Sequence, residues 1–317
     1  MKRIFVAIMA LGALVSCSKD ELVSVNRQAI QFGNAFVENS TRATDPSYGG
    51  TTASLTSFDV YGTVTGTAGT VNIFNGDKVT GAIGSSVWTC TNNQYWIDGA
   101  RYEFAAVVDA DGVTQDTDNN MPTALTYNTR GQKDLLYATA TATGQASGND
   151  KVNFSFSHLL SKAQFTVKSN TEGGYYYSVK DIKVNNFETG TYTIANGTWA
   201  GTTAKDIEFG AIEKVTKTDA NGKTNATQML LIPTTADFKV SFTVELWNDK
   251  GTEATTDDVK LSTVTYSGNT AKTVSQDLVK GNAYDFNLSL SVGEKIEFTV
   301  TTAPTWTPAT SGTTVTL

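Results

Sequence analysis

Histidine, cysteine and basic side chains are scarce in this 317-residue sequence. It contains one His and two Cys, which excludes a two-His metal motif and leaves His158 as the sole candidate base for a Ser-His-Asp triad. Lys and Arg number 24 against 31 Asp and Glu, a formal net charge of −7 at pH 7. Because there is no basic surplus to displace counterions from phosphates, we expect no nucleic-acid partner.

Helix-favouring residues are also sparse. Leu, Glu, Lys and Arg are few, whereas Thr and Gly are abundant, and hydrophobic residues still make up 39% of the chain. This composition is typical of strands and excludes both a helical bundle and wholesale disorder. Segments of period-two alternation, such as residues 152–158 and 284–290, are separated by turn residues and predict half-buried strands.

Two antiparallel β-sandwiches in tandem are the predicted all-β architecture. Short strands at regular spacing without helical periodicity favour sandwiches, and the polar, glycine-containing residues 144–150 form the best internal linker. We therefore predict an N-terminal sandwich over residues 43–150 and a C-terminal sandwich over residues 151–317, both of ordinary domain size.

The longest apolar run lies at the N-terminus. A charged start precedes apolar residues 4–15, which predicts a signal peptide over residues 1–16 and is too short to span a membrane. The tetrad Leu-Val-Ser-Cys at residues 14–17 resembles a bacterial lipobox, in which the Cys17 thiol receives diacylglycerol and becomes the first residue of the mature lipoprotein. An ordinary secretory signal with an incidental Cys is the alternative.

The remaining candidates for chemistry favour structural roles. Cys90 has no disulfide partner once Cys17 carries lipid, and a buried small hydrophobe is favoured over a nucleophile. His158 keeps step with the apolar positions of its segment, which predicts a buried, hydrogen-bonded side chain. The acidic residues within 109–118 lack the spacing of a Ca²⁺ loop. We predict no catalytic residue, no metal and no cofactor, and hence no enzyme.

Several short segments carry a resemblance that covers most of the chain. They are the lipobox ending at Cys17, residues 30–32 with 40–43, Trp88 with 95–106, and residues 134–138, 154–163, 230–233, 280–286 and 296–300 ahead of Trp306. In this order and spacing they resemble the fimbrillin family of Bacteroidetes, the type V pilin subunits. Residues 18–21 resemble the charged signal that directs Bacteroidetes lipoproteins to the outer face of the outer membrane.

This resemblance implies two transthyretin-like sandwiches and a secreted lipoprotein precursor at the outer membrane. In such families a protease cuts after an Arg in the N-terminal loop, and Arg42, followed by Ala43, is the matching position. The cut would remove residues 17–42, including a strand at residues 29–37, and leave a groove. Other fimbrial subunits would then fill the groove by strand addition, so that the trimmed protein sits in a fimbrium at the cell surface.

The C-terminus matches the family's donor strand. This segment is extended, β-prone and uncharged, but has few bulky anchors. It consists of Thr313, Thr314, Val315, Thr316 and Leu317. A tip or accessory subunit, or a strand paired within its own domain, therefore remains open.

The roles of the N-terminal strand and of Arg42 also stay open. Residues 29–37 are either the removable strand or a permanent edge strand, and Arg42 is either a cleavage site or a solvated charge. A different class of function is a permanently lipid-anchored module that binds glycans through exposed Trp and Tyr side chains. The candidate tryptophans are Trp88, Trp96, Trp199, Trp247 and Trp306, although anchoring of strands in the core is favoured for most of them. A receptor on a host or bacterial surface is a further candidate partner.

Overall fold

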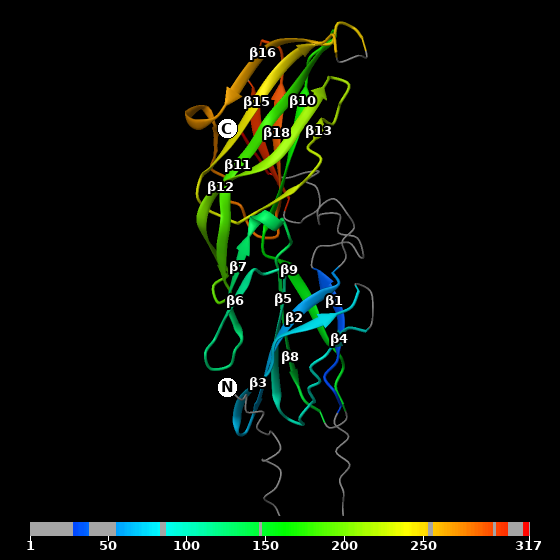
Figure 1. Ribbon diagram of the computed structural model, residues 1–317, viewed down its shortest axis with the longest axis vertical. Coiled ribbons are helices and arrows are strands. Elements are labelled where there is room, and N and C mark those ends of the chain that lie inside the picture. Colours follow the sequence, from blue (N-terminus) through cyan, green and yellow to red (C-terminus); the bar gives the residue numbers. More distant parts are fainter. Residues whose placement is uncertain are drawn as a thin grey trace, which may run out of the picture.

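Strands make up most of the part of the chain that the structure describes. The computed structural model describes residues 28–37, 55–82, 87–145, 148–252, 256–293, 296–303 and 313–316. Within these ranges the helical segments are two 3-10 turns, Thr129–Gly131 and Gly268–Thr270. The predicted all-β class is confirmed. Two bodies of strands lie end to end along the long axis, with the N-terminal one at the lower end of Figure 1.

The lower body is built from one seven-stranded sheet in the order β1-β9-β8-β5-β2-β3-β4. Its strands are β1 (Phe32–Val37), β2 (Ser57–Gly66), β3 (Gly69–Thr80), β4 (Thr89–Cys90), β5 (Arg101–Val108), β8 (Leu136–Thr143) and β9 (Val152–His158). The β1–β9 pair is parallel, whereas the other pairs are antiparallel. An isolated bridge joins Phe32 of β1 to Trp88, next to β4. The two ends of the strand order therefore meet, and β1 closes the sheet on itself.

The upper body packs two sheets face to face. One has the order β13-β10-β18-β19-β20, with β14 also on β10. Its strands are β10 (Ser161–Ser169), β13 (Lys223–Thr224), β14 (Met229–Leu231), β18 (Ala283–Leu290), β19 (Glu297–Ala303) and β20 (Thr313–Thr316). The β10–β18 pair is parallel over all of β18 and over all of β10 except Ser161. Alternating apolar side chains of these strands fill a common core with those of the facing sheet.

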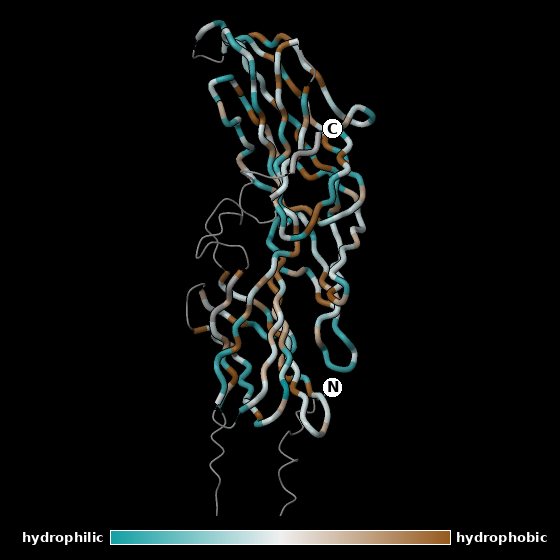
Figure 2. Tube along the Cα trace, turned by 180° about the vertical axis from the view of Figure 1, so that it is seen from behind, coloured by the Kyte–Doolittle hydropathy of each residue, from teal (hydrophilic) through white to brown (hydrophobic). Residues whose placement is uncertain are grey.

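The facing sheet has the order β16-β15-β11-β7-β6, with β12 on β11 and β17 on β15. Its strands are β6 (Gly112–Gln115), β7 (Pro122–Asn128), β11 (Tyr175–Thr193), β12 (Thr198–Val215), β15 (Phe238–Asn248), β16 (Val259–Tyr266) and β17 (Lys272–Val274). Hydropathy alternates along many of the strands in both bodies (Figure 2). No helix in the described ranges has the length and apolar character to cross a membrane.

The long strand β11 joins the two bodies. It pairs with β15 near its start and, from Thr189 to Thr193, with β7, which belongs to the N-terminal half of the sequence. A third apolar cluster fills the junction, and Leu125, Leu160, Tyr192 and Ile232 are among its buried members. The junction is therefore a packed core rather than a flexible connection.

The change from one core to the other comes after residue 158 rather than at the expected boundary of 150. Strand β9 pairs with β1 and β8 in the lower sheet, and Phe154 and Phe156 belong to the lower core. Residues Leu159 and Leu160 enter the junction cluster, and β10 begins the upper body. The polar residues before β9 thus connect two strands of one sheet, since the same turn composition serves hairpins and linkers alike.

Candidate functional site

The segment that contains β1 closes the lower body because it forms backbone hydrogen bonds with a neighbouring segment on each of its two edges. The amide of Ile30 donates to the carbonyl of Gln94 at 2.7 Å, and the amide of Val152 on β9 donates to the carbonyl of Gln31 at 2.8 Å. Residues 28–37 therefore lie between β9 and the segment before β5, where they satisfy backbone groups on both neighbours. This matches the strand expected at residues 29–37.

Phe32 is the main apolar anchor of this segment. Its side chain is 2% exposed, and its ring centroid lies 5.5 Å from Phe74, 6.1 Å from Phe154, 6.2 Å from Phe58 and 6.4 Å from Phe104. Three of these contacts are edge-on and the one with Phe154 is stacked, which are the arrangements that aromatic pairs prefer. We call the site formed by these four neighbours the Phe32 socket.

The pairing of β1 with β9 is irregular directly after Phe32. The register shifts between Phe32 and Ala35, so that both of these side chains point into the core and are buried. Gly33 occupies the irregular stretch, where an added Cβ would collide with the side chain of Asn153. In β1, a large buried anchor is thus followed by a residue without a side chain where the strand lies closest to Asn153.

Two tryptophans line the side of the groove opposite β9. Trp88 and Trp96 are 4% and 6% exposed, and they pack on Phe58 and Tyr102 with ring centroids 5.3 Å and 4.6 Å apart. Neither indole N–H has a hydrogen-bond partner in the described part of the protein. These side chains contribute apolar surface rather than polar bonds, and both are unavailable for stacking on a glycan.

The other tryptophans also have structural partners. Trp199 donates its indole N–H to the carbonyl of Leu159 at 2.8 Å, across the junction. Trp247 lies on the outer face of the upper body, where Lys180 and Lys260 sit over its ring at 5.9 Å and 5.5 Å. Trp306 lies outside the described residues. Only one of the four described indoles, Trp247, therefore has an outward setting, and lysines cover it.

The predicted donor segment forms an edge strand of the upper body. Strand β20 pairs antiparallel with β19, and Val315 lies opposite Val300. It is the last strand in its sheet order, so one of its backbone edges is unpaired within that sheet. Leu317, together with Cys17, Arg42 and Ala43, lies outside the described residues.

His158 is a buried structural residue, as predicted. Its Nδ1 lies 2.7 Å from Oδ2 of Asp134, and the two residues are 5% and 4% exposed. The pair sits at the end of β9, where the two bodies meet. Cys90 is half-buried at the lower core, and burial is the main reason that the pKa of its thiol is raised. A protonated thiol is a poor nucleophile.

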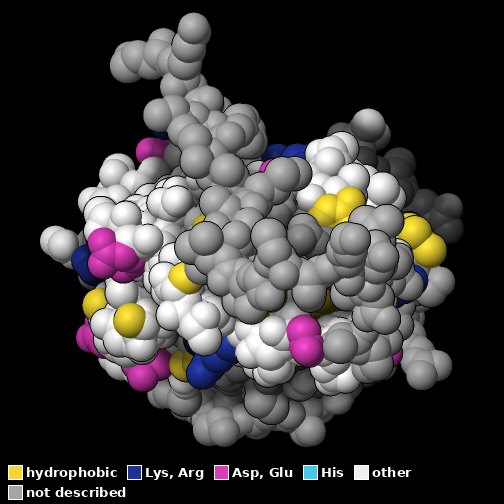
Figure 3. Space-filling view, turned by 90° about the horizontal axis from the view of Figure 1, so that it is seen from below, with side chains coloured by type: hydrophobic (Ala, Val, Ile, Leu, Met, Phe, Trp, Pro, Cys, Tyr) yellow, Lys and Arg dark blue, Asp and Glu magenta, His cyan; other side chains and the backbone are white. Residues whose placement is uncertain are grey.

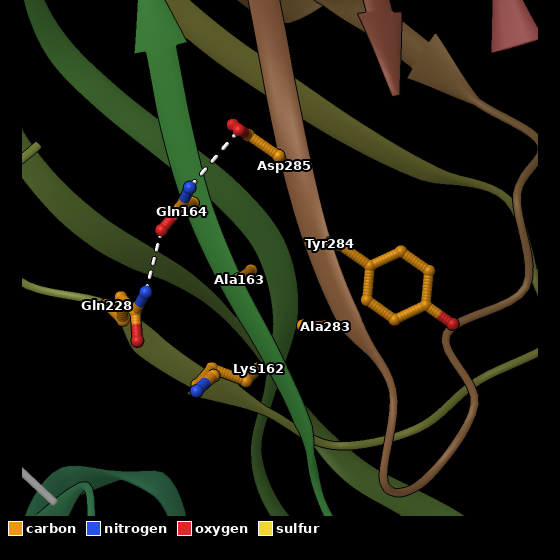
Figure 4. A pocket seen from close by; sticks show the side chains of 7 residues that line it. All are labelled: Lys162, Ala163, Gln164, Gln228, Ala283, Tyr284 and Asp285. Atoms are coloured by element: carbon orange, nitrogen blue, oxygen red, sulfur yellow. Dashed lines mark hydrogen bonds between the residues drawn. The ribbon is translucent and has the colours of Figure 1, made fainter. Parts of the chain in front are cut away.

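A small polar depression on the upper body is the other site with converging side chains. Gln228 donates to Gln164 at 2.6 Å, and Gln164 in turn donates to Asp285 at 3.1 Å (Figure 4). Thr166 also donates to the same carboxylate at 2.9 Å. Burial raises the pKa of Asp285 despite these bonds. Tyr284 points to the opposite side of the sheet, whereas Lys162, which is 4% exposed, also lines the depression (Figure 4). The hydrogen-bond network joins β10 to β18.

The described residues provide no metal site, and the lower end of the molecule shows no patch of one charge (Figure 3). No three His, Cys, Asp or Glu side chains among the described residues are grouped to hold a metal ion. At the lower end of the molecule, the acidic, basic and apolar side chains that can be seen are interspersed (Figure 3). The groove closed by β1 is therefore the strongest candidate for function, and it is a site for a strand rather than for a small molecule.

Residues 41–306 match the family model described as fimbrillin-like. The protein belongs to the fimbrillin-like family. Its fold is similar to that of a fimbrial protein from Bacteroides vulgatus, with a TM-score of 0.64 and 18% identity over 89% of this chain and 100% of that one.

A second solved structure shares the fold of this fimbrillin-like chain. It is a candidate cell adhesion protein from Bacteroides uniformis, with a TM-score of 0.51 and 19% identity over 89% of this chain and 99% of the other. Among curated protein sequences, none matches the chain with significant similarity.

Proposed function

We propose that this protein is a structural subunit of a fimbrium that is exported as a lipoprotein, trimmed by proteolysis and assembled by strand addition for adhesion at the cell surface. The family match supports the fimbrial role, as does the similarity to a fimbrial protein from Bacteroides vulgatus. The single observation that carries the mechanism is the position of β1, which closes a sheet from its edge and inserts Phe32 into the core.

Export and trimming follow from the N-terminal sequence. Lipid on Cys17 holds the precursor at the outer membrane only while residues 17–42 stay joined to the sandwiches. Cleavage between Arg42 and Ala43 cuts the chain after β1 and before β2. The same cut therefore releases the protein from its anchor and turns β1 into a separate fragment that is held by non-covalent contacts alone.

Loss of β1 makes the lower body receptive to another strand. The carbonyl of Gln94 and the amide of Val152 lose their partners in residues 28–37, and the Phe32 socket is opened to water. Unpaired backbone groups and exposed aromatic surface are both unfavourable. A strand from a neighbouring subunit that restores the bonds and fills the socket is therefore bound strongly.

The C-terminal segment is the proposed donor to a neighbour. Strand β20 lies at the edge of its sheet and contacts β19 through four residue pairs, so it can leave without dividing the upper core. Its extended residues Thr313–Thr316, with Leu317, would then pair with the receiving sheet of another subunit. The chemistry of the protein is thus assembly rather than catalysis, and other fimbrial subunits are its partners.

Intact mass and N-terminal sequencing of protein recovered from the cell surface test this proposal. The native chain is expected to begin at Ala43 without lipid and to be found in oligomers with other fimbrial subunits. An Arg42→Ala variant is expected to stay lipidated at Cys17 and monomeric. An Arg27→Ala variant, changed at another Arg of the same N-terminal segment, should be processed normally. A native chain that begins at acylated Cys17 and never polymerises contradicts the proposal and favours a lipid-anchored binding protein.

A further inference from the structure

We infer that the groove closed by β1 receives its strand from a different subunit, one with an aromatic or large aliphatic anchor followed by a small residue. A second copy of this chain is not the donor. The inference rests on the proposed function, because the groove opens only if β1 leaves. It names the class of partner that the groove selects.

The size of the Phe32 socket sets the first requirement. Four phenylalanine rings surround Phe32 with centroids 5.5 to 6.4 Å away, and the side chain is 2% exposed. A Thr or Val side chain in this place leaves most of the socket empty, because closely packed rings collapse only partly around a smaller group. An occupant without a large anchor therefore binds much more weakly than β1.

The path of β1 sets the second requirement. Its buried apolar side chains are Ile30, Phe32 and Ala35, so the inward positions are two and then three residues apart. The extra residue falls at the register shift, where Gly33 approaches Asn153 closely. A strictly alternating strand cannot place both of its flanking side chains in the core across this point.

The C-terminus of this chain meets neither requirement. Residues 313–317 read Thr-Thr-Val-Thr-Leu, with a strict two-residue alternation and with Val and Leu as the largest side chains. The one aromatic residue nearby, Trp306, stands between Pro304 and Pro308, and neither proline can donate a backbone hydrogen bond to the receiving sheet. Binding of this segment to another subunit would also require it to break its existing strand pairing, because β20 is already paired with β19.

Peptide binding to the trimmed protein tests this inference. The full chain is cleaved after Arg42, the N-terminal fragment is removed, and fluorescently labelled peptides are titrated while anisotropy is followed. A peptide of residues 28–37 should bind tightly, and its Gln31→Thr version should bind equally well because Gln31 is exposed. The Phe32→Thr version and a peptide of residues 303–317 should each bind at least about 100-fold more weakly.

The possible results separate the two proposals. If the peptide of residues 303–317 binds within about tenfold of the residue 28–37 peptide, a second copy is an adequate donor and the inference is wrong, although strand addition stands. If neither the peptide of residues 303–317 nor the peptide of residues 28–37 binds, the groove does not accept strands and both proposals fail. Light scattering of the trimmed protein alone measures its oligomeric state and tests the inference independently. We expect monomers, and self-polymerisation would overturn the inference.

Discussion

Replacing Phe32 by Ala should destabilise the uncleaved precursor strongly and leave the trimmed protein unaffected. Phe32 is 2% exposed and touches four other rings. A buried aromatic side chain removes roughly 150–250 Å² from water, worth about 4–6 kcal/mol at about 25 cal/mol per Å². Since Ala retains part of this burial, the expected loss is about 3–5 kcal/mol.

Urea unfolding followed by tryptophan fluorescence measures this loss, because Trp88 and Trp96 lie in the same core as Phe32. With a urea dependence of about 2 kcal/mol per M, the unfolding midpoint of the lower body should fall by roughly 2 M. The matched control is Phe286→Ala in the upper core, which is fully buried with Phe165 at 4.9 Å. This control should lower stability to the same extent before and after trimming.

The contrast between the two forms is the decisive part of the experiment. After cleavage and removal of residues 1–42, Phe32 is no longer part of the protein, so wild type and Phe32→Ala must unfold at the same midpoint. A midpoint shift below about 0.5 M in the uncleaved chain would refute the reasoning, because it would mean that β1 is not an integral part of the lower core.

Three further changes probe the junction and the upper body. Asp134→Ala leaves the buried His158 side chain without this hydrogen-bond partner, and urea unfolding should show a loss of about 1–3 kcal/mol; a loss below about 0.5 kcal/mol would contradict the pairing. Trp199→Phe removes the hydrogen bond to Leu159 and should cost about 1 kcal/mol, with no change expected in trimming. Burial raises the pKa of Asp285 above its ordinary 3.8, so the native state holds that proton more tightly than the unfolded state does. The stability that this group contributes therefore falls as pH rises from 3.8 through the raised pKa. Melting temperature measured against pH should show this fall in the wild type and a smaller fall in Asp285→Asn; an equal fall in both would contradict the raised pKa of Asp285.

The strand class and the first strand of the fold could be predicted from local sequence. Period-two alternation indicated the strands around Phe154 and Tyr284, and the alternation of Ile30 and Phe32 marked the strand that became β1. These features depend on which side chains face inward within one segment, so a single sequence contains the necessary information.

The partners of these strands could not be predicted in the same way. The ring contacts of Phe32 come from β2, β3, β5 and β9, which are far apart along the chain. Likewise, residues 144–150 have the composition of a turn, which does not reveal whether the next strand rejoins the same sheet. Long-range pairing decided both the closure of the lower sheet by β1 and the place of β9 within it.

The continuous strand β11 has a mechanical consequence for a molecule that works in a fibre. It runs from the upper body into the junction (Figure 1), paired with β12 along nearly its whole length and with β15 and β7 in succession on its other edge. Antiparallel hydrogen bonds lie perpendicular to the strands. Tension along the strand direction therefore loads these bonds together in shear rather than opening them one at a time, and β11 carries such a load across the junction through its pairs with β12 and β7.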